Sequence, residues 1–124
     1  TRLGLVPAMI SPYLVRALGA AQARRYMLTG ERLAAPEAKR LGFAHECVPA
    51  AQLDAAVERL CARLAQGGPE ALARTKKLLA RVEAAPLDAS LVAETAAALA
   101  ETRAGAEARE GIRSFLEKRK PSWQ

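Results

Sequence analysis

Apolar residues recur along the second half of the chain with the spacing of amphipathic helices. Six of them fall at i, i+3, i+4, i+7, i+8 and i+11, the spacing of one helix face: Leu53, Ala56, Val57, Leu60, Cys61 and Leu64. Residues 67–69, Gly-Gly-Pro, end this helix and start another over 69–82. The pattern predicts two apolar-faced helices, over 53–66 and 69–82.

Two further helices are predicted downstream. Ala85-Pro86 interrupts the pattern, and Asp88 suits the N-cap of a helix that carries apolar residues as far as Leu99. After Gly105 a last apolar stripe continues to Leu116. Residues 50–124 therefore predict an all-helical region.

The first part of the chain mixes short elements. Ser11 is expected to cap a helix that runs to Leu18, with Pro12 at its first position, and Gly19 separates it from a second helix over 21–28. A short helix over 35–42 follows, opened by Pro36 and closed by Gly42. Residues 43–48 are the best strand candidate, and residues 2–5 resemble the end of another strand.

Composition supports a mainly helical, single-domain protein. The chain has 124 residues, of which 51% are hydrophobic and only 4% aromatic, with abundant alanine. No long apolar run and no signal segment are present, so a membrane span is excluded and a cytoplasmic location is expected.

The net charge of +6 raises the question of an anionic partner. Basic residues gather at 24–25, 76–77 and 113–120, which fits either a solvated helix face or a site for a small anionic ligand. Nucleic acid is disfavoured because no binding motif or aromatic stacking platform accompanies the charge.

The residues by themselves predict no self-contained active site. His45 is the only histidine, and it lies next to Glu46 in the strand candidate, where neighbouring side chains point to opposite faces. Cys47 and Cys61 show no metal-ligand or disulfide spacing, so we expect buried, inert thiols and no metal site. No phosphate loop is present.

Two blocks of sequence carry a family resemblance that spans nearly the whole chain. Residues 28–38, LTGERLAAPEA, run into LGFAHECVP at 41–49, and EGIRSFLEKRKPSW closes the chain at 110–123. Together they resemble the C-terminal part of the enoyl-CoA hydratase/isomerase (crotonase) family. The resemblance implies the C-terminal helical portion of an α/β ββα-spiral fold, with residues 1–49 ending the spiral core and 50–124 forming a helical oligomerisation region.

The resemblance also implies where the chemistry lies. Family members stabilise a thioester enolate with two backbone N–H groups, and in the hydratases two glutamates hold and activate the attacking water. Both glutamates are expected upstream of Thr1, in an N-terminal catalytic half that this chain does not contain. Glu31, Glu37 and Glu46 fall on structural positions of the family pattern and are not expected to replace them. No catalytic residue is therefore expected in the chain, and no cofactor beyond the coenzyme A of the substrate.

The resemblance carries over three substrate-binding residues. Ala8 matches the position whose backbone N–H helps to hold the water. Phe115 and Lys118 match positions that reach coenzyme A, often of a neighbouring subunit, and at i, i+3 on one helix they would face one ligand. Met9 and Ile10 stand where many relatives have glycine, which resembles methylglutaconyl-CoA hydratases. Core packing of Phe115 and Met9, and solvation of Lys118, are the competing interpretations.

Three functions stay open at this point. The leading one is the C-terminal portion of an acyl-CoA hydratase that is inactive as this chain alone and pairs with a missing N-terminal half or partner chain. A homotrimer or hexamer is expected, with Trp123 anchoring the tail against a neighbouring subunit. The alternatives are an enoyl-CoA isomerase of the same fold and a non-catalytic helical oligomerisation or anion-binding module.

Overall fold

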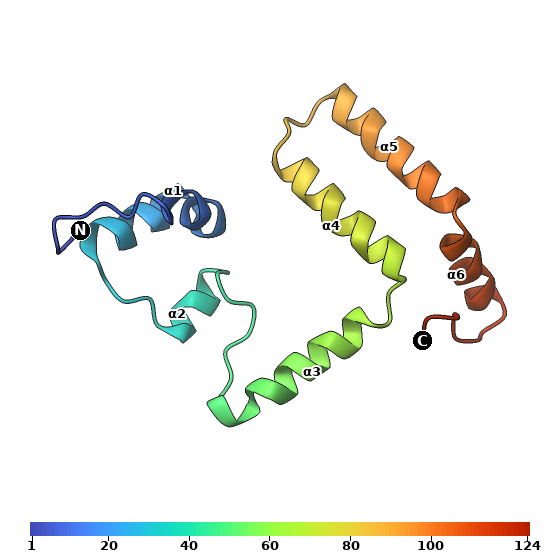
Figure 1. Ribbon diagram of the computed structural model, residues 1–124, viewed down its shortest axis with the longest axis horizontal. Coiled ribbons are helices and arrows are strands. Elements are labelled where there is room, and N and C mark those ends of the chain that lie inside the picture. The colour runs from blue at the N-terminus through green and yellow to red at the C-terminus, as the bar shows by residue number, and fades with distance from the viewer. The chain divides into compact units, whose positions relative to one another are not determined.

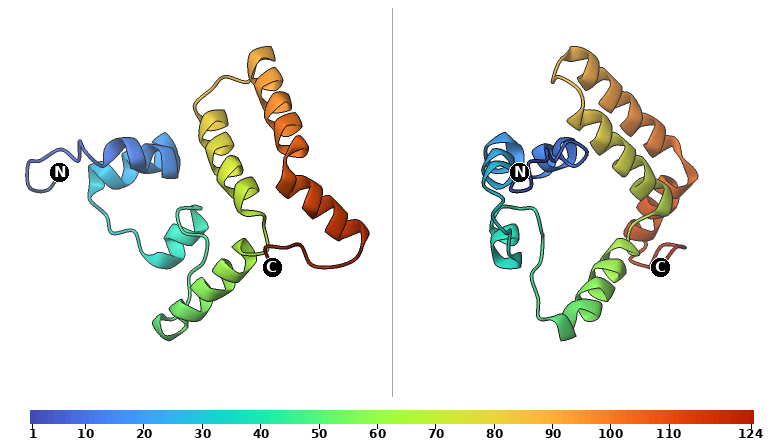
Figure 2. Two further views of the ribbon diagram at one scale, coloured as in Figure 1. Left: turned by 45° about the vertical axis from the view of Figure 1, so that its right-hand side comes forward. Right: turned by 60° about the vertical axis from the view of Figure 1, so that its left-hand side comes forward.

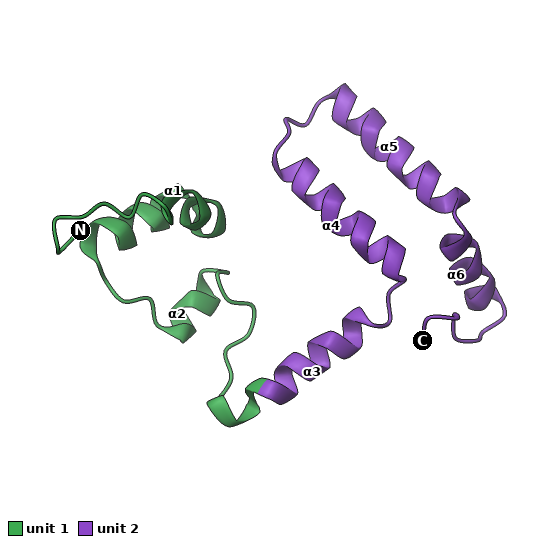
Figure 3. Cartoon of the chain, viewed as in Figure 1, with its two compact units in different colours: residues 1–53 green, residues 54–124 purple.

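The computed structural model describes residues 1–124 and divides into two compact units. Unit 1 contains residues 1–53 and unit 2 contains residues 54–124 (Figure 3). The elements are helices throughout, in the order shown in Figure 1, and each unit is described by itself.

Unit 1 is built around helix α1 (Ser11–Thr29), which is broken at Gly19. Gly19 has φ 75° and ψ 157°, a conformation that a residue with a Cβ rarely adopts, so α1 consists of two helical segments, as predicted. The predicted N-cap at Ser11 is wrong: Ser11 is the first residue of α1, the N-cap is Ile10, and the Ser11 hydroxyl donates to the Ala8 carbonyl at 2.9 Å. Gly30 closes α1 in the left-handed region.

The predicted strand over 43–48 is wrong for this chain. Helix α2 (Ala35–Arg40) is followed by a turn in which the N–H groups of Phe43 and Ala44 both donate to the carbonyl of Ala38, at 2.9 and 3.1 Å. The segment therefore turns back on α2, and residues 44–49 form no ladder. A strand needs a partner for its backbone groups, and neither unit supplies one.

The strand end expected at residues 2–5 is also absent. The N–H of Gly4 donates to the Thr1 carbonyl at 3.0 Å, which closes a turn. The Arg2 guanidinium donates to the Thr29 carbonyl at 3.3 Å and the Thr1 hydroxyl donates to the Met27 carbonyl at 3.3 Å. The first residues are thereby attached to the C-terminal end of α1 (Figure 1).

The predicted helices of the second half are confirmed. A 3₁₀ turn (Ala50–Gln52) leads into α3 (Leu53–Leu64), and α4 (Pro69–Glu83), α5 (Ala89–Ala104) and α6 (Ala106–Leu116) follow. The Asp88 carboxylate accepts from the Leu91 N–H at 2.9 Å, which confirms the predicted N-cap of α5. Helices α4 and α5 run antiparallel, and α6 contacts both (Figure 2).

Little apolar surface is buried within either unit. The only buried hydrophobic residues are Ala23, Ala38, Ala56 and Leu91, and no large side chain is fully buried. The large residues of the α3 stripe stay about half exposed, with Val57 at 51% and Leu60 at 55%. The stripes that the pattern predicted are present but uncovered, so their burial against another polypeptide segment stays a prediction.

No helix of the chain is both long enough and apolar enough to cross a bilayer.

Candidate functional site

The turn that ends α6 places Lys118 in an unusual backbone conformation. Lys118 has φ 52° and is the only residue other than glycine with a positive φ. The Arg119 N–H donates to the Ser114 carbonyl at 3.0 Å and the Lys118 N–H donates to Phe115 at 3.2 Å. This bonding resembles a left-handed helix C-cap, in which glycine is the usual residue. A lysine there carries a conformational cost of roughly 1 kcal/mol.

Phe115 and Lys118 are both exposed on the surface of unit 2. The Phe115 side chain is 81% exposed, so its core-packing interpretation is wrong within this chain. The expected i, i+3 arrangement on one helix is also wrong, because α6 ends at Leu116 and Lys118 belongs to the left-handed turn. The two residues are nevertheless adjacent through the backbone hydrogen bond that joins them.

Arg119 clamps this turn against α6. Its guanidinium donates to both carboxylate oxygens of Glu110, at 2.6 and 3.0 Å, and to Glu117 at 2.6 Å. The Ser122 N–H also donates to Glu110, at 3.2 Å. These charge-assisted contacts lower the pKa of the Glu110 carboxyl below its usual value, with the Arg119 hydrogen bond as the main cause, and raise the pKa of Arg119.

Acid should release this clamp. The pKa of Glu110 is lower in the folded chain than its ordinary value of 4.5, which applies to the unfolded chain. The ionised Glu110 carboxylate therefore stabilises the folded chain fully above pH 4.5. This stabilisation is lost as the pH falls from 4.5 through the pKa of the folded chain. We expect Glu110→Gln to lower the melting temperature at pH 7. The difference from the wild type should shrink toward pH 3. A difference that stays constant between pH 7 and pH 3 would show that ionised Glu110 stabilises nothing.

The C-terminal tail folds back onto unit 2. The Trp123 indole N–H and the Gln124 side-chain amide both donate to the carbonyl of Gln66, in the loop between α3 and α4, at 3.3 and 2.7 Å. The Trp123 ring also lies against Gly111, so closely that a Cβ there would meet it at 3.1 Å. Trp123 thus contacts its own chain.

A shallow hollow of about 290 Å³ lies between α4, α6 and this tail. Its wall includes Arg74, Thr102, Glu107 and Trp123. The Glu107 carboxylate accepts from the N–H groups of Glu70 and Ala71, at 2.9 and 2.8 Å, and so caps the first turn of α4 from another helix. The groups that line the hollow therefore hold the helices together.

In unit 1, Ala8 is exposed and its backbone N–H is already engaged. It donates to the Val6 carbonyl at 2.8 Å across a tight turn at Pro7. Met9 is 90% exposed, so nothing in unit 1 packs against its side chain.

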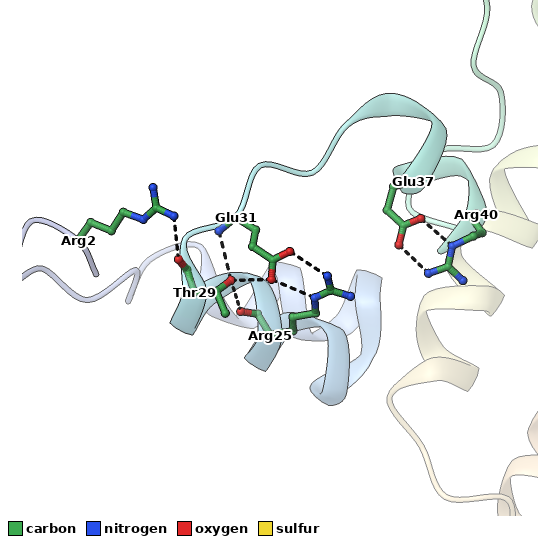
Figure 4. A network of polar contacts seen from close by, with 6 residues as sticks. All are labelled: Arg2, Arg25, Thr29, Glu31, Glu37 and Arg40. Atoms are coloured by element: carbon green, nitrogen blue, oxygen red, sulfur yellow. Dashed lines mark hydrogen bonds and ion pairs between the residues drawn. The ribbon is translucent and has the colours of Figure 1, made fainter.

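Glu31 and Glu37 of unit 1 are each paired with an arginine (Figure 4). Glu31 binds Arg25 in a bidentate pair at 3.0 and 2.9 Å and also accepts from the Thr29 hydroxyl. Glu37 binds Arg40 at 2.6 Å. The arginines lower the pKa of both carboxyls, which makes them poor proton acceptors. Both carboxylates therefore serve as partners of arginine side chains within unit 1.

Other candidates show no catalytic arrangement. His45 is exposed in an irregular segment. Cys47 and Cys61 are free and exposed, so the prediction of buried thiols is wrong. Cys61 lies on the apolar face of α3, and this face is uncovered here. No group of three or more His, Cys, Asp or Glu side chains is placed to hold a metal ion.

The sequence reasoning missed the two carboxylates that organise unit 2. Glu110 begins the closing block of the chain, and Arg119 lies nine positions later. Residues nine positions apart are not neighbours on the surface of a regular helix. Glu107 caps α4 by accepting from the N–H of Glu70, 37 residues earlier in the chain. No local signal identifies either contact, since both depend on how α6 and its tail pack.

The chain matches known proteins over its full length. The model of the family described as enoyl-CoA hydratase/isomerase matches residues 1–124. A relative from Rhodobacter capsulatus, named "Probable enoyl-CoA hydratase", is 38% identical over 122 residues, which are 98% of this chain and 47% of that protein. The chain spans about half the length of the curated relatives it matches.

Solved structures agree with this match. An enoyl-CoA hydratase from Shewanella pealeana has a TM-score of 0.90 and 40% identity, over 98% of this chain and 45% of that one. An enoyl-CoA hydratase/isomerase from Marinobacter aquaeolei has a TM-score of 0.90 and 37% identity, over 98% and 46% of the two chains. The predicted likeness to the helical part of this fold is confirmed.

Proposed function

Because the chain belongs to the enoyl-CoA hydratase/isomerase family, we propose that it is the C-terminal part of a longer acyl-CoA hydratase. That enzyme adds water to a 2-enoyl-CoA through a thioester enolate held by backbone N–H groups. The family match over residues 1–124 is the observation that carries the proposal. The relatives named as hydratases, of which the chain spans about half, support it.

The water-activating glutamates would lie upstream of Thr1, and residues 1–124 alone would be inactive. Two observations support this assignment. Glu31 and Glu37 are held in arginine pairs that lower the pKa of each carboxyl, and the only histidine is exposed with no catalytic partner described beside it. General base catalysis needs a group that is free to accept a proton near neutral pH.

Lys118 would bind the phosphates of coenzyme A, with Phe115 beside it. Both side chains are exposed. Lys118 also occupies a left-handed position where glycine would cost less, and a side chain kept at a strained position is a recognised sign of function. A lysine ammonium next to a phosphate forms a charge-assisted contact.

Ala8 would hold the attacking water through its backbone N–H only after a local change. That N–H donates to the Val6 carbonyl in the present structure, so the turn at Pro7 has to open, or the bond has to be shared with the water. Met9 and Ile10, both exposed, would face the acyl group and select branched substrates of the methylglutaconyl-CoA type.

A homotrimer or hexamer in the cytoplasm would be the working form. The exposed apolar stripe of α3 supports the need for a covering chain, because a stripe of this kind is rarely left in water. The double-bond isomerase of the same family is the second candidate, and the family description includes both activities.

Incubation with a 2-enoyl-CoA in water labelled with ¹⁸O tests these proposals. The full-length protein should give a 3-hydroxyacyl-CoA that carries one heavy oxygen, and residues 1–124 alone should give no product. A shifted double bond without added water would identify the isomerase instead. If the full-length protein forms neither product, the result would favour the non-catalytic module.

A further inference from the structure

We propose that Arg119, fixed by Glu110, is a positioning residue that holds Lys118 in place for a phosphate group. The inference rests on the proposed role of Lys118 and adds two residues to it. Neither of them needs to touch the ligand.

The turn at Lys118 holds a backbone conformation that is unfavourable for lysine. Lys118 adopts φ 52°, which a lysine would leave for the right-handed or extended regions if nothing opposed the change. Backbone bonds from Lys118 and Arg119 to the last turn of α6 support the turn at 3.2 and 3.0 Å. Such a turn at a chain end normally frays.

The Arg119 side chain holds this turn closed. The Arg119 guanidinium donates to the Glu110 carboxylate, which lies in the middle of α6. It also donates to Glu117, where the turn begins. Arg119 thus joins the middle of α6 to its end across the left-handed residue. The Arg119 guanidinium also donates to the Lys120 carbonyl at 3.0 Å.

The C-terminal tail is anchored on the other side of Lys118. Glu110 accepts from the Ser122 N–H, and the indole of Trp123 reaches Gln66 beyond it. The residues on both sides of Lys118 are therefore anchored, while the Lys118 side chain is exposed and its ammonium forms no ion pair within unit 2. The clamp thus presents the Lys118 side chain from an anchored backbone turn, which reduces the ordering cost of anion binding.

The charge of Glu110 makes this inference testable. If surface charge alone mattered, Glu110→Gln would remove a negative charge and strengthen the binding of a phosphate-bearing ligand. If Glu110 acts by holding Arg119 and hence Lys118, the same substitution weakens that binding. The two accounts predict opposite signs for one variant.

The measurement is KM and kcat of the full-length protein with a coenzyme A thioester and with a truncated thioester that lacks the nucleotide. We expect Glu110→Gln to raise KM for the coenzyme A thioester on the order of 3- to 10-fold, with little change in kcat. KM for the truncated thioester should not change. Glu101→Gln is the matched control, because it removes an exposed carboxylate that lies 3.8 Å from Arg74 on other helices.

A double-mutant cycle separates positioning from direct contact. In a Lys118→Ala protein, Glu110→Gln should add nothing to KM, because the residue through which it acts is gone. An unchanged or lowered KM in the single Glu110 variant, or additive effects in the double variant, would overturn the inference while Lys118 keeps its role. An indifferent Lys118→Ala variant would overturn the phosphate role of Lys118 and this inference with it.

Discussion

Replacing Lys118 with alanine in the full-length protein should weaken the binding of an acyl-CoA thioester by about 1–3 kcal/mol, the cost of losing one charge-assisted contact. This corresponds to roughly 5- to 150-fold in the dissociation constant. The turnover number should change less, because the thioester carbonyl reacts far from the nucleotide. Titration calorimetry with a non-reactive acyl-CoA gives the affinity, and steady-state kinetics give the turnover number.

Salt and substrate truncation supply the controls for Lys118. The loss should shrink at high ionic strength because screening weakens exposed charge pairs, and a thioester without the nucleotide should be indifferent to the substitution. Equal losses for the complete and the truncated thioester would return Lys118 to the role of a solvated cation.

A glycine at position 118 should separate binding from stability. Lys118→Gly should weaken coenzyme A binding as much as Lys118→Ala does, because both substitutions remove the lysine ammonium. It should also raise the free energy of unfolding by roughly 1 kcal/mol, because glycine adopts the left-handed region without the steric cost that φ 52° imposes on lysine. An unaltered or lowered stability would show that the turn is not strained.

Replacing Gly68 with alanine should destabilise unit 2 by roughly 0.5–2 kcal/mol through the loss of the cap on α4. A Cβ at this position overlaps the Glu107 carboxylate. The Glu107 side chain can swing away at little steric cost, but it then abandons its bonds to the N–H groups of Glu70 and Ala71. Chemical denaturation of the wild type and the variant measures the difference.

Two further variants test this explanation. Gly67→Ala is the matched control, because its Cβ would come to 3.1 Å from the Leu72 side chain, which can shift without losing a hydrogen bond, and it should cost less. Glu107→Ala should destabilise to a similar extent as Gly68→Ala, and the double variant should lose little more than either single one. Additive losses would show that Gly68 and Glu107 act independently.

The sequence by itself determined the helices and the family. Gly19, Pro69 and Asp88 mark breaks and caps whose effects are local, since they act on backbone conformation or on N–H groups one turn away. For the same reason the helices over residues 53–64 and 69–83 were predicted nearly to the residue. The two sequence blocks that resembled the crotonase family identified it correctly.

Tertiary structure decided the contacts between distant residues. Residues 43–48 are the best strand candidate in the sequence, but no second strand is present to pair with their backbone groups, and the segment turns back on Ala38 instead. The capping of α4 by Glu107 joins positions that no helical or strand period relates. The Arg119 clamp likewise depends on the turn at Lys118, whose positive φ no propensity predicts for lysine. Local sequence sets which backbone groups form helices, whereas only the packed chain brings a carboxylate to a donor many residues away.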